Sequence, residues 1–146
     1  MVILIMQNNY LISILGIQTV GGISEDVELI CVGSYIKKNN KYYIVYSEYD
    51  EDSPKSKTTN TLKVEENKVT LIRTGFKSSR LILEKGVKHI CEYNMGSYSM
   101  FVGVSTNNID CSLDNNGGEL HIKYSLDTDS KLLSTNEIHI KIKENV

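Results

Sequence analysis

Apolar and polar residues alternate one by one through most of this chain, and this period predicts half-buried β-strands rather than helices. The alternation is clearest from Asn107 to Lys143. Within it, Asn116-Gly117 is the dipeptide that best fits a two-residue type I′ turn, because both central residues of that turn need positive φ. A turn centred there puts the apolar residues of both strands on one face, by pairing Leu113 with Leu120, Cys111 with Ile122 and Ile109 with Tyr124.

The next hairpin needs one residue more than its obvious turn provides. A two-residue turn at Asp129-Ser130 would place Ile138 opposite His121 and mix the two faces, so we expect a longer loop or a bulge between Thr128 and Asn136. The added residue gives the pairs Ile138 with Ile122, Ile140 with Leu120, Glu137 with Lys123, Lys141 with Glu119 and His139 with His121. Together with the preceding hairpin, it predicts an outer ladder of Asp110, Lys123 and Glu137. The two histidines would be exposed and could take up nickel or zinc adventitiously, which is not a functional metal site.

The same reading over the whole chain predicts an all-β fold. The expected strands are Leu11 to Thr19, Glu25 to Lys38, Lys41 to Tyr49, Lys57 to Glu65, Lys68 to Gly75, Ser79 to Glu84, Lys88 to Tyr93, Tyr98 to Thr106, Ile109 to Asp114, Glu119 to Asp127 and Asn136 to Lys143, two of the shorter ones merging across a bend. Tight hairpins are expected at Asn39-Asn40, Glu66-Asn67, Asn107-Asn108 and Asn116-Gly117. Such a meander removes its exposed edges by closing, which predicts a single antiparallel up-and-down barrel of about eight to ten strands.

Composition limits the classes of function. With 16 basic and 18 acidic residues among 146, the net charge is −2, so we expect no nucleic acid and no membrane surface as partner. We expect one domain over residues 11–146, preceded by an N-terminal extension over residues 1–10 whose apolar start, MVILIM, lacks the features of a signal peptide. Either Met1 or Met6 can be the natural start. Three cysteines within strands, Cys31, Cys91 and Cys111, fit free thiols and a cytoplasmic location.

One arginine is predicted to face the barrel interior. A turn at Glu66-Asn67 pairs Leu62 with Leu71, and the same period brings Asn60 and Arg73 onto that apolar face. An interior guanidinium keeps its charge and needs a carboxylate, carbonyl groups or an anionic ligand. Three readings stay open: an ion pair with Glu84 or Glu92, an anchor for an anionic ligand, or a bulge that turns the side chain outward.

Tyrosine is the main aromatic residue, with nine against two phenylalanines and no tryptophan. In strands, a tyrosine ring can pack while its hydroxyl reaches a partner or a polar cavity, although tyrosine is also an ordinary core or sheet residue. The strand tyrosines are Tyr35, Tyr43, Tyr46, Tyr93 and Tyr124.

Motifs of catalysis and cofactor binding are missing from the sequence. The chain has no GxSxG, no GxGxxG and no phosphate-binding loop, and Ser34-Tyr35-Ile36-Lys37 matches SxxK only by chance because it lies in a strand. His89 and Cys91 share a strand face but lack a second ligand pair, so no metal site is expected there. We therefore expect no cofactor.

Several runs of the sequence resemble one family. They are LISILGIQT, GSYIKKNNKYYIVYSE, TTNTLKVEENKVTLIRTG, LEKGVKHICEY, GVSTNNIDCSLDNNGGELHIKYSL and NEIHIKIKE, which span Leu11 to Glu144. In order and spacing they resemble the YwiB-like family of uncharacterised bacterial proteins. The resemblance implies a lipocalin-like (calycin) β-barrel and a bacterial, cytoplasmic protein, and it implies no activity or substrate. Matching family positions are Arg73, Gly75, Gly86, His89 and Tyr93.

Taken together, the sequence favours a non-enzymatic small barrel that binds a small polar or anionic ligand in its interior. The candidate ligand-binding residues are Arg73, His89, Tyr93, Tyr46 and Tyr124. The alternative is a protein-interaction module with a filled barrel core and no small-molecule ligand. An enzyme that uses Arg73, His89 and nearby tyrosines is a third and weaker reading, and a second ionisable group beside His89 inside the cavity would favour it.

Overall fold

The computed structural model describes residues 9–50, 52–94 and 98–145, and all of its regular elements are β-strands. Residues 1–8, which make up most of the expected N-terminal extension, lie outside this part. The alternation of apolar and polar residues explains the absence of helices from the described residues. The ten strands are β1 Tyr10–Val20, β2 Ile23–Lys38, β3 Lys41–Tyr49, β4 Lys57–Val64, β5 Lys68–Gly75, β6 Ser79–Glu84, β7 Lys88–Asn94, β8 Ser99–Asp114, β9 Gly117–Thr128 and β10 Lys131–Glu144.

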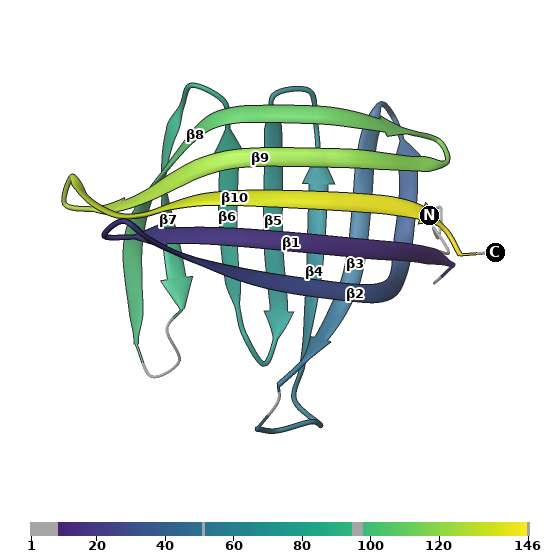
Figure 1. Cartoon of the computed structure of the whole chain (residues 1–146), viewed down its shortest axis with the longest axis horizontal. Helices are drawn as coiled ribbons and strands as arrows, with labels where there is room; N and C mark the ends of the chain where they lie inside the picture. The colour runs from purple at the N-terminus through teal and green to yellow at the C-terminus, as the bar shows by residue number, and fades with distance from the viewer. Residues whose placement is uncertain (1–8, 51, 95–97, 146) are drawn as a thin grey trace.

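The strands form one closed antiparallel barrel in sequence order, and β1 pairs with β10 to close it. In Figure 1 the long strands β1, β2, β9 and β10 run across the front, and β3 to β7 run behind them in a crossing direction. The first and last described residues meet where Asn145 N–H donates to the Asn9 carbonyl at 2.8 Å. The all-β meander barrel predicted from the sequence is confirmed.

Two hairpins have the predicted turns and registers. Asn39 and Asn40 have φ of 53° and 62°, as a type I′ turn between β2 and β3 requires. Between β4 and β5 the pairs run without a shift from Val64 opposite Val69 to Asn60 opposite Arg73. No bulge therefore turns Arg73 outward, and the interior face predicted for it is correct.

The hairpin between β8 and β9 is displaced from its predicted register. Asp114 pairs with Gly117 and Cys111 with Leu120, so the turn is centred on Asn115-Asn116 instead of Asn116-Gly117. Neither turn asparagine has a positive φ, and the Asp114 carboxylate stabilises the turn by accepting a hydrogen bond from Asn116 N–H at 2.8 Å. The shift keeps the apolar face but places Asp110 opposite His121, so the predicted contact of Asp110 with Lys123 is wrong.

The predicted hairpin at Asn107-Asn108 is also wrong, because β8 runs through these residues. Its register against β9 shifts between Thr106 and Asn108, which marks a β-bulge at Asn107. Before the bulge the buried side chains of β8 are at even-numbered positions, such as Val104, whereas Leu113 is buried beyond it. A one-residue bulge reverses side-chain parity as a turn does, so alternation alone does not distinguish the two.

The hairpin between β9 and β10 confirms the parity argument. Asp129 and Ser130 form the turn with φ of 50° and 63°, and the added residue is a bulge between Leu132 and Ser134. All five predicted pairs are present, including Ile138 opposite Ile122 and His139 opposite His121.

The core fills one end of the barrel more completely than the other. Its fully buried side chains include Ile12, Ile44, Val64, Val69, Val104, Leu120 and Ile122. At this end Tyr35 donates its hydroxyl to the Asp114 carbonyl at 2.6 Å, and Tyr42 donates to the Leu113 carbonyl at 2.8 Å. These bonds connect β2 and β3 to the end of β8 across the barrel. Both tyrosines therefore have a packed ring and a hydrogen-bonded hydroxyl, as expected for a tyrosine in a strand.

No helix long and apolar enough to cross a membrane occurs among the described residues. All three cysteines lie in this part of the chain, and none of them forms a disulfide, as predicted.

Candidate functional site

A cavity of about 320 Å³ lies inside the barrel, with walls from β1 to β7, β9 and β10. Aliphatic side chains form a large part of its wall, including Ile14, Leu29, Leu62, Leu71, Leu81, Ile138 and Ile140. Four of the five candidate residues line it, namely Arg73, Tyr46, Tyr93 and Tyr124. The inward period of four strands brings these residues together, and the sequence predicted their common location.

Arg73 is placed on the interior wall by its two neighbouring strands. It lies opposite Asn60 on β4 and Ser79 on β6, and its side chain is partly buried. The guanidinium Nε donates to Asn60 Oδ1 at 3.1 Å. Among the described residues no carboxylate lies within 4.0 Å of it, so the ion pair with Glu84 or Glu92 considered above is not formed.

Asn60 is fully buried, and its two amide atoms have different environments. Oδ1 accepts from Arg73, which can only donate, and this fixes the orientation of the amide. Nδ2 is buried without an acceptor in the described part of the chain. The pair Asn60–Arg73 therefore presents more donors than the surrounding groups satisfy.

Two cavity tyrosines, Tyr46 and Tyr124, are neutral phenols at physiological pH. Burial raises the pKa of Tyr124 to about 12, with a further rise from Tyr93 and an opposing effect of the Arg73 charge. Burial also raises the pKa of Tyr46, supported by the nearby Glu48 carboxylate and opposed by Arg73. Both groups keep their O–H and can donate a hydrogen bond to an acceptor in the cavity.

His89, the fifth candidate, is not brought to the cavity. Its Nε2 lies 2.8 Å from Glu84 Oε1, close to the connection between β6 and β7. The interpretation of the chain as an enzyme requires that His89 lie beside a second ionisable group inside the cavity. The His89–Glu84 pair lies apart from the cavity wall that Arg73 and the tyrosines form, so these groups are not assembled into one acid–base site.

Other polar groups of the wall were missed from the sequence. Glu48 follows Tyr46 at the inward period of β3, and Asn136 precedes Ile138 at the inward period of β10. Extending the alternation by one step would have found both. Glu25 also lines the cavity, at a part of β2 where all residues from 23 to 28 are exposed, so that burial gives no alternation to follow.

Comparison with known proteins gives one family and one fold. The family described as "Domain of unknown function (DUF1934)" matches residues 12–140. The "Uncharacterized beta-barrel protein YwiB" of Bacillus subtilis (strain 168) is 31% identical over 105 residues, which is 72% of each chain. The crystal structure of the ywiB protein from Bacillus subtilis superposes with a TM-score of 0.82 and 22% identity, and covers 97% of this chain and 96% of that one. This likeness shows the barrel fold.

Proposed function

Because the chain belongs to the DUF1934 family, a family of unknown function, its role has to be inferred from the barrel, and we propose that it binds a small organic anion inside the cavity. The resemblance stated from the sequence is confirmed by this membership. In the proposed complex, Arg73 binds the anionic group of the ligand, and the tyrosines add hydrogen-bond donors.

The observation that carries the proposal is the excess of donors at Arg73. The Nε group is bound by Asn60 Oδ1, while no described carboxylate neutralises the charge. A buried amide group, Asn60 Nδ2, also lacks an acceptor beside it. Burying a charge without a partner is costly, and a carboxylate or phosphate fits the fork of guanidinium donors.

The size and wall of the cavity define the class of ligand. A volume of about 320 Å³ lies at the lower end of the range for small-molecule sites. The aliphatic wall favours a ligand with an apolar body, and the neutral hydroxyls of Tyr46 and Tyr124 favour an acceptor at its head. A small organic acid with an apolar chain satisfies all three conditions.

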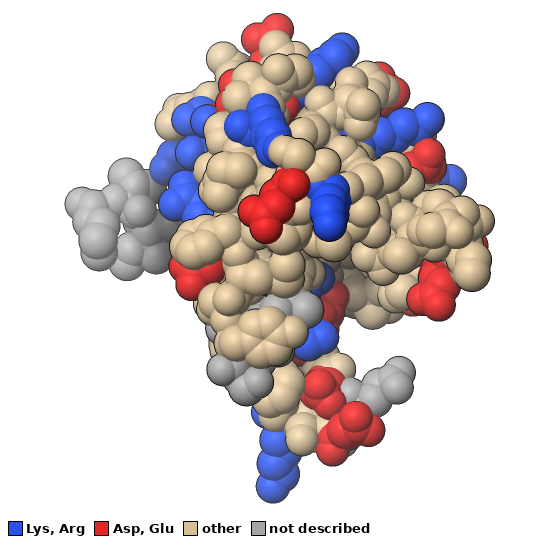
Figure 2. Space-filling model, turned by 90° about the vertical axis from the view of Figure 1, so that its left-hand side faces the viewer, with Lys and Arg blue, Asp and Glu red and all other residues tan. Residues whose placement is uncertain are grey.

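Acidic groups on the same wall limit the charge of the ligand. Glu48 and Glu25 line the cavity with Arg73, so a ligand with several negative charges would be repelled. The outer surface agrees with this limit, since the net charge is −2 and both acidic and basic side chains occur on the face shown in Figure 2. We infer a ligand with a single anionic group.

The test uses octanoate and its neutral analogue 1-octanol, followed by NMR chemical shifts of the labelled protein. We expect octanoate to bind in the cavity and Arg73→Leu to weaken it by about tenfold or more, while 1-octanol binding is unchanged or improved. Arg80→Leu is the matched control, because Arg80 is the other arginine and is exposed on β6. Equal octanoate affinity of wild type and Arg73→Leu, with both folded by circular dichroism, would contradict the proposal.

A second candidate is binding of a protein partner at the edge of β2. Among the described residues, the segment 23–33 pairs with β1 alone, because the pairing with β3 begins at Ser34. Val27 and Ile30 on it are 72% and 61% exposed. A free edge with apolar side chains can accept an added strand. Photo-crosslinking in the native host from a probe at position 30 would detect such a partner, and a probe at position 141 on β10 is the control.

We also propose a reducing, cytoplasmic location from the state of the thiols. Cys31, Cys91 and Cys111 are all free. Titration of the unfolded protein without reductant should count three thiols, and a stable count of one would contradict this location.

A further inference from the structure

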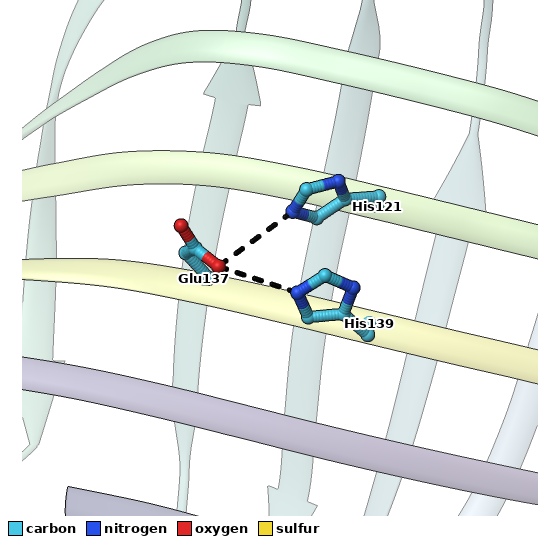
Figure 3. Close-up of side chains that lie close together, drawn as sticks. All are labelled: His121, Glu137 and His139. Atoms are coloured by element: carbon cyan, nitrogen blue, oxygen red, sulfur yellow. Dashed lines mark hydrogen bonds and ion pairs between the residues drawn. The ribbon is translucent and has the colours of Figure 1, made fainter.

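Three side chains with metal-ligand chemistry converge on the outer face of β9 and β10. His121 and His139 lie directly opposite each other across the two strands, and Glu137 precedes His139 by two residues on the same face. Figure 3 shows both imidazole rings directing a nitrogen toward the same carboxylate oxygen. We propose that His121, Glu137 and His139 form a binding site for Zn²⁺ or a similar divalent transition-metal ion.

The distances between the ligand atoms suit a tetrahedral ion. Glu137 Oε2 lies 3.3 Å from His139 Nε2 and 3.9 Å from His121 Nε2, and the three ligand atoms all lie within 4.8 Å of one another. Ligands bound to zinc at about 2.0 to 2.1 Å with tetrahedral angles are separated by about 3.3 Å. Small side-chain rotations therefore bring the three atoms to coordination distance.

The rings are held in position by the sheet before any ion binds. Their centroids are 3.9 Å apart with an interplanar angle of 19°, so they stack across the strand pair. His121 Nε2 is buried and has no hydrogen-bond partner among the described residues. A buried ring nitrogen without a partner, aimed at a carboxylate, is a polar group that a metal ion would satisfy.

The charges around the site allow a cation. Lys123 lies 3.6 Å from Glu137 Oε1, the carboxylate oxygen that does not face the histidines. Asp110 on β8 lies opposite His121 and adds a negative charge on the same face. Glu137 Oε2 thus remains directed toward the two rings, as drawn in Figure 3.

The number of ligands determines the character of the site. Two imidazoles and one carboxylate are the ligand set of several catalytic zinc sites, in which a fourth position is left for water. Structural zinc sites are closed by four protein ligands, and this one is not. Since the strand pair holds the ligands without an ion, chelation should leave the fold intact.

The experiment titrates untagged, chelator-treated protein with Zn²⁺ by calorimetry and with Co²⁺ by visible absorption. We expect one Zn²⁺ per chain with a Kd below about 10 μM, and Co²⁺ bands of tetrahedral intensity. His139→Gln and Glu137→Gln should each weaken binding by about tenfold or more. His89→Gln is the matched control, because it removes the remaining histidine of the chain and leaves the cluster intact.

Three results would overturn the site. The first is a wild-type Kd weaker than about 100 μM, which would show that binding is adventitious. The second is unchanged affinity in both cluster variants. The third is loss of binding in His89→Gln. Circular dichroism of each variant, with and without chelator, should show the same β-sheet signal. A chelator-induced loss of that signal would contradict a site preformed by β9 and β10.

Discussion

Arg73 donates from Nε to Oδ1 of Asn60 across the β4–β5 pair, at 3.1 Å. The amide oxygen solvates the guanidinium but leaves its charge uncompensated, and the other amide atom, Nδ2, is buried without an acceptor. A carboxylate in the place of this amide would have nearly the same shape and the opposite effect on the charge. Asn60 is therefore the position at which the anion site can be blocked while Arg73 is kept.

Asn60→Asp should weaken anion binding without removing any donor of Arg73. The new carboxylate would form an ion pair with the guanidinium and replace the anionic group of the ligand. We expect octanoate affinity to fall by about tenfold or more, as measured by NMR titration. Asn107→Asp is the control, because it adds the same charge at the exposed bulge of β8. Retained affinity in Asn60→Asp would mean that Arg73 does not bind the anion.

Tyr35→Phe should destabilise the barrel at the end opposite the cavity. The hydroxyl of Tyr35 donates to the Asp114 carbonyl at 2.6 Å, and its loss leaves a partly buried acceptor without this partner. We expect a loss of about 0.5 to 1.5 kcal/mol in the free energy of unfolding, measured with urea. Tyr43→Phe should have almost no effect, since its hydroxyl makes no hydrogen bond within the described residues. Equal effects of the two changes would contradict a role for this bond.

Glu65 should make stability depend on pH in the acid range. Partial burial opposes its ionisation, but the hydrogen bond from Lys41 and the charges of Lys68 and Lys63 outweigh burial and lower the pKa of this carboxyl. The ionised form is therefore favoured by folding, so its contribution is complete above the ordinary pKa and is lost as pH falls through the lowered one.

The variant Glu65→Gln isolates this contribution. Near pH 7 we expect it to lower the free energy of unfolding by about 0.5 kcal/mol, because the group is near the surface. The difference from wild type should shrink as pH falls below about 4 and should also shrink in high salt. Glu119→Gln removes one exposed ion pair with Lys141 and serves as the control. A difference that grows on acidification would show that the sign of this argument is wrong.

Side-chain parity explains which parts of the fold and site could be predicted. Where one face of a strand pair is buried and the turn is short, a register error of one residue would expose the core. For this reason the sequence predicted correctly the registers of β4–β5 and β9–β10 and the interior position of Arg73. The observed β8–β9 register differs from the predicted one by two residues. A shift of two residues leaves every side chain on its predicted face, so parity does not detect it. The alternation predicts a turn at Asn107, where the structure has a bulge, because turns and one-residue bulges both reverse side-chain parity.

The site shows the same limit. Parity predicted the interior face for Arg73 and Tyr124, while Tyr46 and Tyr93 were candidates only as strand tyrosines, and all four line the cavity. Parity gives no information on depth along the barrel axis. His89 lies at another level, near the connection between β6 and β7, and pairs with Glu84, a contact that no local pattern indicates. The convergence of His121 and His139 did follow from the register, because opposite residues on one face of a strand pair are always neighbours.

Gly118→Ala should show why the β8–β9 hairpin has its observed register. Gly118 has φ of 131°, and a Cβ atom there would collide with the backbone oxygen of Ser112, so backbone must move. We expect a loss of about 3 kcal/mol or more in the free energy of unfolding, from conformational strain and overpacking together. Gly86→Ala is the matched control, because φ is 80° but the space around it is open, and it should cost only about 1 to 2 kcal/mol. A larger loss in Gly118→Ala would show that the close approach of the two backbones requires glycine at position 118, near the Asn115-Asn116 turn. If both variants lose the same stability in urea unfolding, positive φ alone accounts for Gly118, and the steric explanation of the register is wrong.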